Sequence, residues 1–533
     1  MRLLSSKSLI FYTFRTSGYN LFAQDTFKVT NNLTLNYGLR YELNTVLHEK
    51  RGRLSSFWPD RFSTFLDPNA SQTDVAALQA SGVVLQDDVG RVYLGDHNNF
   101  APRFGFAYRL GRDSRTVLRG GYGLFYDTVL GNVPGNVMLN PPFLPNFFVP
   151  APFTQWPNAF APSGFPVLTV VDKNLRTPYS QQFNLGVQRE LPGRMLLDVA
   201  YVGSTGTKLP RFRQIDQAFI TQDQINALTP DVVTRMELMG IPPPVAQFLS
   251  MHINLIPPIA RGPYFGFAQI FQAEDSISSQ YHSLQAKLDK RLGHGLTFLT
   301  SYTYAKSIDG ASVFFGSGAN GTTIFPQDNY NLRAERGPSD FDIRHRLSLS
   351  FVYQVPSWRE AFSSMPLLLA EGWELSGILT LQTGQPFSVL SGMDNSSTGL
   401  GNDRPDLIGD PFAGTCPGSL KPHSVDCWLN PASFQQNAVL TFGDSGRNAF
   451  RGSGFHGFDF SILKNTKFRE NWTVQFRAEF FNLTNHPNFA LPNNVLASPS
   501  FGALFQTPDA AQNNVGLGSG GPRLIQFGLK LSF

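Results

Sequence analysis

The chain has 533 residues, of which 15% are charged and 13% are aromatic, with 48 Phe against 16 Tyr. An average soluble domain carries about 25% charged residues, so this chain is poor in charge. Its net charge of +4 is spread without a basic block, which excludes an electrostatic surface for nucleic acid. No run of about 18 apolar residues occurs, so a membrane-spanning helix is excluded. A large soluble all-β protein and a membrane β-barrel remain.

Residues 1–17 form no clear element. A secretory signal needs a basic start, an apolar stretch and a small-residue cleavage site. Lys7 interrupts the apolar stretch, and no such cleavage site follows. The segment could supply a poor fourteenth strand, although Lys7 and Arg15 disfavour it. We expect either that the protein is not exported by such a signal or that its true start lies upstream.

Strict alternation of apolar and polar residues marks the rest of the chain. It is clearest in residues 33–42, 472–480 and 525–533. Successive side chains of a strand point to opposite sides, so each segment has one apolar and one polar face. The same alternation predicts thirteen strands, at 18–28, 31–43, 100–110, 115–126, 180–191, 194–203, 279–291, 295–305, 343–355, 371–390, 455–467, 471–484 and 523–533.

The predicted connections alternate between short and long, which a soluble sandwich has no reason to do. Short turns at one end and long loops at the other are typical of outer-membrane barrels. The long set is 44–99, 127–179, 204–278, 306–342, 391–454 and 485–522. We expect these loops to be folded surface structures that carry recognition or serve as protective cover. A short helix is predicted from Thr221, where Thr221 and Gln224 have capping-box spacing.

Several stretches, in order, resemble one family. They include YNLFAQDTFKVTNNLTLNYGLRYE (19–42), YHSLQAKLDKRLGHGLTFLTSYTYAKSID (281–309) and FDFSILKNTKFRENWTVQFRAEFFNLTNHPNF (458–489). The chain resembles the C-terminal barrel of TonB-dependent outer-membrane receptors of the Oar-like kind, which are abundant in acidobacteria and usually carry a carboxypeptidase-regulatory-like domain. The terminal Phe533 resembles the signal that barrel-assembly machinery reads.

The resemblance implies an all-β, transmembrane antiparallel β-barrel with long extracellular loops and short periplasmic turns. Family members have 22 strands, an internal plug and a TonB-contacting segment, whereas this sequence has about 13–14 strands and no plug. We therefore expect residues 18–533 to be the C-terminal part of a receptor barrel, and residues 1–17 to mark a truncation or a miscalled start. The implied partners are outer-membrane lipid, barrel-assembly machinery and, only if a plug is supplied, the TonB complex.

The charges favour a membrane barrel over a soluble sandwich. Inside a sandwich core each would cost several kcal/mol unless paired, whereas in a wet lumen they cost little. The alternative is that the polar faces are solvent faces of a soluble sheet. Tyr122, Tyr126, Tyr302 and Tyr304 lie near strand ends, where an aromatic girdle is expected. The candidate lumen-facing residues are Arg40, Arg119, Lys287, Asp289, Arg344, Arg346, Arg477 and Glu479.

The other motifs give less information about function. Cys416 and Cys427 predict a loop disulfide, with idle thiols or a metal site as alternatives. Residues 516–521 match G-x-G-x-x-G, but Pro522 and a strand follow, so a flexible loop is expected. Asp342 and His345 lie close without a nucleophile, and the segments at 394–399 and 402–405 have turn chemistry. No catalytic, cofactor or metal site is predicted.

Two functions remain open beside a soluble β-rich protein. The first is a TonB-dependent receptor for uptake of an unidentified substrate, and not an enzyme. The second is a surface binding or adhesion protein that uses the barrel as an anchor. A chain without a plug could not perform gated uptake alone.

Overall fold

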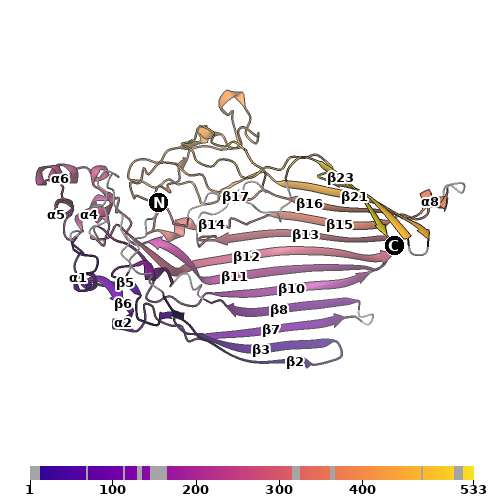
Figure 1. The fold of residues 1–533 in the computed structure, drawn as a ribbon, viewed down its shortest axis with the longest axis horizontal. Coiled ribbons are helices and arrows are strands. Elements are labelled where there is room, and N and C mark those ends of the chain that lie inside the picture. Colours follow the sequence, from indigo (N-terminus) through magenta and orange to yellow (C-terminus); the bar gives the residue numbers. More distant parts are fainter. Residues whose placement is uncertain are drawn as a thin grey trace.

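The structure is a computed structural model and describes residues 12–67, 70–111, 115–128, 135–143, 165–293, 295–314, 324–360, 366–469, 472–508 and 520–533. One sheet of 15 strands dominates it, and thirteen of these follow one another in sequence order as antiparallel neighbours (Figure 1). They are β2 (Gly18–Lys28), β3 (Leu33–Asn44), β7 (Asn99–Leu110), β8 (Thr116–Tyr126), β10 (Tyr179–Leu191), β11 (Met195–Gln214), β12 (Gln269–Gly293), β13 (Leu296–Asp309), β15 (His345–Gln354), β16 (Trp373–Gln382), β21 (Phe455–Arg469), β22 (Trp472–Phe481) and β23 (Leu524–Ser532).

All thirteen predicted strands are present, and the alternation of their connections is confirmed. Every short connection lies at one end of the sheet and every long one at the other, with the C-terminus at the short-turn end (Figure 1). Two tight turns use glycine in a left-handed conformation: Gly193 has φ 79° and Gly295 has φ 76°. A Cβ on Gly295 would lie 2.3 Å from the carbonyl oxygen of Gln354, so this turn requires glycine.

Three strands, β11, β12 and β16, differ most in length from the prediction. β11 has 20 residues and β12 has 25, about twice the roughly 9–11 that a tilted strand needs to cross a bilayer. β11 and β12 have two register shifts between Gly206 and Arg211, and they continue to pair with each other beyond these shifts. The predicted strand at 194–203 is therefore too short, whereas the predicted strand at 371–390 is too long, because β16 ends at Gln382.

Just beyond the end of β16, two backbone segments approach each other closely. A Cβ on Gly384 would lie 1.8 Å from the carbonyl oxygen of Gly452, so the two chain segments approach closely. Beyond it the chain forms β17 (Pro386–Phe387), which pairs with β20 (Phe450–Arg451) outside the main sheet. A proline has no N–H for a ladder, which fits a break at this point.

The two faces of the sheet are the feature that positions every site. Cross-strand pairing aligns Tyr302, Leu347, Leu381 and His456 on one face, and their neighbours Thr303, Arg346, Gln382 and Phe455 on the other. The apolar face is uncovered along most of the wall: on β23, for example, Phe527 is 68% and Leu529 is 76% exposed. In the described part of the chain, no second β-layer packs on this face, as a soluble sandwich would require.

Aromatic residues gather at both ends of the apolar face. At the long-loop end, Tyr122, Tyr302 and Tyr304 are exposed, as expected for a girdle, and Tyr126 pairs with Tyr179. At the short-turn end, two stacked pairs occur, Trp358 with Trp373 and Trp472 with Phe533, at 5.7 and 5.4 Å between ring centroids. Amphipathic rings at two levels are typical of a wall that crosses a membrane.

The long loops fold into their own small elements, most of them at the end of the sheet where α4, α5 and α6 lie (Figure 1). β9 (Val167–Val171) joins β12 in parallel, the one parallel pair among the named strands that the structure describes. The predicted capping box is confirmed at Thr221 and Gln224. The minor strands are β1 (Phe14–Arg15), β4 (His48–Glu49), β5 (Ser55–Phe62), β6 (Ser81–Leu85), β14 (Gly337–Pro338), β18 (Asp406–Leu407) and β19 (Phe434–Gln435), and the α-helices are α1 (Val75–Ala80), α2 (Gln86–Val89), α4 (Gln222–Asn226), α5 (Val232–Leu238), α6 (Pro243–Ser250), α7 (Pro258–Arg261) and α8 (Leu367–Ala370).

The two outermost strands of the main sheet are β2 and β23. Among the described residues, no strand pairs with the outer edge of either, so the ordered path runs from β2 to β23 without closing. Part of the expected fourteenth strand, residues 1–11, lies outside the described residues. Phe14 and Arg15 form the short β1, which pairs with β4 and not with the main sheet.

Candidate functional site

Charged and amide side chains follow the polar face from strand to strand. Nε of Arg40 on β3 lies 2.7 Å from Oε1 of Glu42, which is two residues further along the same strand. Arg119 on β8 stands opposite Ala107 and Gly186, both of which are small. The register places these two arginines on the same face, which is opposite to the exposed apolar one.

The central strands continue this face. Lys287 on β12 stands opposite Asp198 on β11, and Asp289 stands opposite Leu196. On the next strands, Arg346 pairs in register with Thr303 and Gln382. The face therefore combines both signs of charge with uncharged polar groups.

Strands β22 and β23 complete the polar face. Arg477 on β22 donates from Nε to Oε1 of Gln475 at 2.6 Å. Glu479 stands opposite Ser461 and Gln526, on the same face as Arg477. A cavity of about 540 Å³ opens here, between Arg346, Thr380, Gln382, Asp459, Asn482 and Gln526. Its size is in the range of small-molecule sites, and apolar side chains, among them Ile378 and Phe481, line it beside the polar ones.

Arg344 has a different setting from the other predicted residues. It precedes β15, and its Nε lies 3.2 Å from Oδ2 of Asp342, whose side chain is fully buried. Arg451 also contacts Asp342 and donates to the carbonyl oxygens of Asp342 and Gly384 at 3.0 Å. Arg344 thus belongs to a group of ion pairs where the loops leave the strands.

Buried ion pairs hold two long loops against each other. Arg404 donates from Nη1 to both carboxylate oxygens of Glu335 at 3.0 Å, and both side chains are nearly inaccessible. Arg447 pairs with Asp309 at the end of β13 and lies 3.6 Å from Asp340. Buried charges need such partners, so these contacts fix the two loops to each other and to the end of β13.

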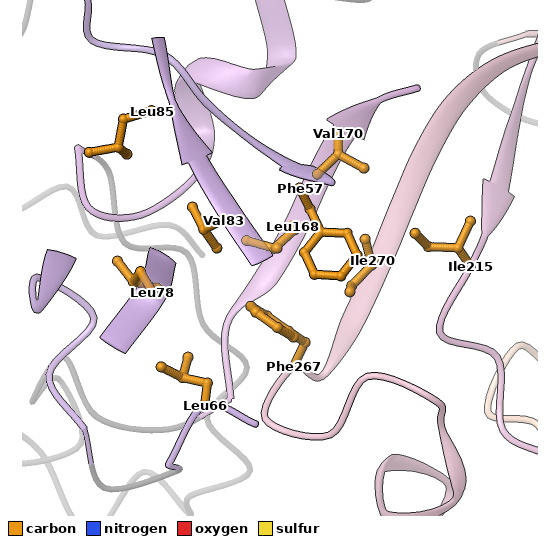
Figure 2. Packing of buried hydrophobic residues seen from close by; sticks show 10 residues of the cluster. All are labelled: Phe57, Leu66, Leu78, Val83, Leu85, Leu168, Val170, Ile215, Phe267 and Ile270. Atoms are coloured by element: carbon orange, nitrogen blue, oxygen red, sulfur yellow. The ribbon is translucent and has the colours of Figure 1, made fainter. Parts of the chain in front are cut away.

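The loops also have hydrophobic cores of their own. Phe57, Val83, Leu168, Phe267 and Ile270 belong to one of them and converge from several loops (Figure 2). Edge-to-face contacts of Phe57 with Tyr264 and Phe267 add to this packing. Within the described residues, all four hydrophobic clusters lie in the loops or the strand extensions, so the membrane-length part of the wall has no protein core.

The helical part of loop 215–268 contains two fully buried arginines, Arg235 and Arg261. Arg235 donates to the carbonyl oxygens of Thr229, Pro230, Ala260 and Gly262, which draws three turns together. Burial lowers its pKa to about 10. Nearby, burial raises the pKa of Asp216 well above its usual value, although the backbone N–H of Tyr264 donates to it.

The two cysteines and several of the described histidines have partners within the protein. Cys416 and Cys427 are joined by a disulfide in the loop that follows β16. Among the described residues, no group of three or more His, Cys, Asp or Glu is arranged to hold a metal ion. His345, close to Asp342 in sequence, instead shares a hydrogen bond of 2.8 Å with Tyr302. The glycine motif at 516–521 lies mainly outside the described residues.

The residues that organise the loops were not predicted from the sequence. Turn chemistry at residues 394–399 is confirmed, because Asp394 accepts from the N–H groups of Thr398 and Gly399. The same interpretation of residues 402–405 overlooked the buried pair of Arg404. Its partner Glu335 is 69 residues away, so no local signal marks it.

Comparison with known proteins gives one family and several distant structures. The family described as outer membrane beta barrel domain matches residues 4–526. Among solved structures, the outer membrane transporter YddB from Escherichia coli is 11% identical with a TM-score of 0.47, over 97% of this chain and 45% of that one. The ferripyoverdine receptor of Pseudomonas aeruginosa is 10% identical with a TM-score of 0.43, over 98% and 39%.

A third solved structure, the ferric enterobactin receptor of Pseudomonas aeruginosa, is 12% identical with a TM-score of 0.42, over 97% of this chain and 45% of that one. This chain thus spans less than half the length of these proteins. No curated protein matches it. No helix in the described ranges has both the length and the apolar character to cross a membrane. From the match over nearly all of its length, the chain belongs to the outer membrane β-barrel domain family and is located in the outer membrane.

Proposed function

We propose that the chain is the C-terminal barrel part of a TonB-dependent receptor of the Oar-like kind, which takes up an unidentified polar substrate. The observation that carries this proposal is the polar face, which runs without interruption from β3 to β23 under a folded loop assembly. A wall of this kind offers a wetted path through an apolar bilayer, and its loops offer a recognition surface. This role is transport and not catalysis.

In this proposal the polar face lines the lumen. Arg40, Arg119, Lys287, Arg346 and Arg477 supply the basic groups of this lining, and Asp289 and Glu479 supply acidic ones. Water solvates these charges at little cost, whereas exposure to hydrocarbon would cost about 2–4 kcal/mol for each Arg or Lys at the midplane. Arg344 acts differently, at the base of the loops.

We also propose that further strands complete the wall beside β2 and β23. A strand edge with free N–H and C=O groups is not tolerated in hydrocarbon, so both edges need partners. Residues 18–533 would then form the C-terminal part of a larger receptor barrel. A plug and a TonB-contacting segment would have to come from outside these residues for gated uptake.

Spin labels at Ala23→Cys on β2 and Phe527→Cys on β23 test the edges in membranes. Both positions lie on the apolar face near the middle of their strands. Labels that stay far apart support additional strands between them. Strong dipolar broadening would show that β2 and β23 pair directly and would contradict the larger barrel.

An uptake assay tests the receptor role. Cells with and without the chain are compared for growth and solute uptake, before and after a protonophore removes the energy of the inner membrane. Uptake that requires both the chain and this energy supports the proposal. Unchanged uptake with a defect in cell contact would favour the adhesion function instead, and recovery of the chain from the aqueous fraction would contradict both.

A further inference from the structure

A large groove lies mainly on the apolar face, at the strand ends, where Gln382 and Phe455 of the polar face also line it. Its volume is about 810 Å³. Its floor is the cross-strand row of Tyr302, Leu347, Leu381 and His456, at the long-loop ends of β13, β15, β16 and β21. Loop residues form the other walls, among them Trp428 and Phe489. The groove is therefore continuous with the lipid-facing surface and lies at its extracellular border.

The lining of this groove combines apolar groups with imidazoles. Four of the nine histidines of the chain line it: His345, His423, His456 and His486. They come from β15, from β21 and from two different loops. Of the described residues that line it, none is Asp, Glu, Lys or Arg. Without a carboxylate, the groove offers an anion no repelling charge.

The histidines are held in place by their neighbours. Tyr302 and His345 share a hydrogen bond of 2.8 Å between Oη and Nδ1, and the rings of His456 and His486 lie 5.1 Å apart, edge to face. His486 donates from Nδ1 to the carbonyl oxygen of Pro487 at 2.8 Å. His423 stacks on Phe412 and meets the edge of Trp428.

We propose that this groove binds a phosphorylated glycolipid of the outer leaflet. One acyl chain would lie on the Leu347 and Leu381 floor, and the phosphate would meet the imidazoles and the Tyr302 hydroxyl at the rim. The groove opens on the side that lipid covers, which favours a lipid over a soluble peptide. Imidazole N–H groups at the level of the lipid headgroups provide hydrogen-bond donors for the phosphate.

Native mass spectrometry of the full chain in detergent tests this inference. The probes are diphosphoryl lipid A, the same lipid after removal of its phosphates, and phosphatidylethanolamine. We expect the diphosphoryl form to remain bound at least about tenfold more tightly than the dephosphorylated form, as hydrogen bonds to a charged group predict. Equal retention of all three lipids would overturn the proposal.

Variants locate the site. The double variant His456→Ala/His486→Ala should remove the preference for phosphate, and Leu381→Trp should block the floor and weaken both forms of lipid A. His282→Ala is the matched control, because His282 shares the apolar face and bonds to Tyr201 at 2.7 Å but does not line the groove. A shift in electrophoretic mobility on heating shows that each variant is folded.

Two results would contradict the site. The first is an equal loss of lipid in the folded His282→Ala control and in the double variant, which would indicate general lipid contact. The second is retention of Zn²⁺ that depends on His456 and His486 and is removed by a chelator, with no lipid preference. That result would identify a metal site instead. Neither result depends on whether the chain transports a substrate.

Discussion

At the scale of single residues, Asp216 makes the loop assembly sensitive to pH. Its native pKa is raised above the ordinary value of 3.8, mainly by burial, so folding takes up a proton between these two values. The free energy of unfolding therefore includes a contribution that is complete below the ordinary value and is lost as pH rises through the native one. We expect Asp216→Asn to flatten this slope, measured by hydrogen exchange of the 215–268 loop between pH 4 and 8.

Asp231→Asn is the control and should leave the slope between pH 4 and 8 unchanged, because the contribution of Asp231 varies mainly below pH 3.8. Asp231 caps α5 by accepting from the N–H groups of Val233 and Thr234. Hydrogen bonds from Thr234 hold its pKa below the ordinary value, so its contribution is present above that value and is lost as pH falls. The same slope change in both variants would show that the Asp216 carboxyl is not the group responsible.

The Arg404–Glu335 pair is the second test at this scale. Removal of one partner leaves a buried charge, which costs about 3–5 kcal/mol. We expect Arg404→Ala to open the loops to limited proteolysis, and Arg404→Ala/Glu335→Gln to restore part of the protection. Lys173→Ala is the control, since its ion pair with Asp60 is exposed and is worth about 1 kcal/mol or less. Equal protection in all variants would contradict this role.

Residues on the strand faces could be predicted from the sequence, whereas residues in contacts between loops could not. Alternation assigns a side chain to a face, so Arg40 and Arg477 could be placed on the polar face from sequence alone. Contacts between loops depend on the path of the chain in space, and the sequence around Arg404 suits a turn equally well. The groove histidines were missed for the same reason, because they come from four separate segments.

At the scale of elements, the turn between β12 and β13 contains one position that only glycine can occupy. Gly295 has a positive φ, and a side chain there would meet the carbonyl oxygen of Gln354. We expect Gly295→Val to cost about 1–3 kcal/mol and to lower the yield of folded barrel, measured by heat-dependent electrophoretic mobility. Gly135→Ala is the control, as its φ is −66° and nothing lies within 4 Å. An equal yield of both would contradict the requirement.

The strands could be predicted from the sequence, but their ends could not. Along the membrane-length part of the wall the apolar and polar faces alternate strictly, so the strands could be predicted. Above the membrane both faces of β11 and β12 are covered by protein, and this pattern is lost. β22 ends at Phe481, because Asn482 turns with φ 48° and its N–H bonds to Asp459.

At the scale of the whole molecule, one property separates a barrel wall from a soluble sheet: which solvent touches the apolar face. Leu349 and Ser350 are successive residues near the middle of β15, so they lie on opposite faces at almost the same depth. Leu349 pairs with Thr300 and Leu379, and Ser350 with Leu299 and Ile378. Arginine at these two positions therefore compares the two environments directly.

We expect Leu349→Arg to destabilise the folded wall by about 2–4 kcal/mol, since its charge would face hydrocarbon at the midplane. Ser350→Arg should change stability little, because its charge would face water. Urea unfolding of both variants in lipid vesicles measures the difference. A similar loss in both would mean that protein covers the polar face, and a larger loss for Ser350→Arg would reverse the assignment of the faces. Either result would remove the basis for the lumen and for the lipid groove together.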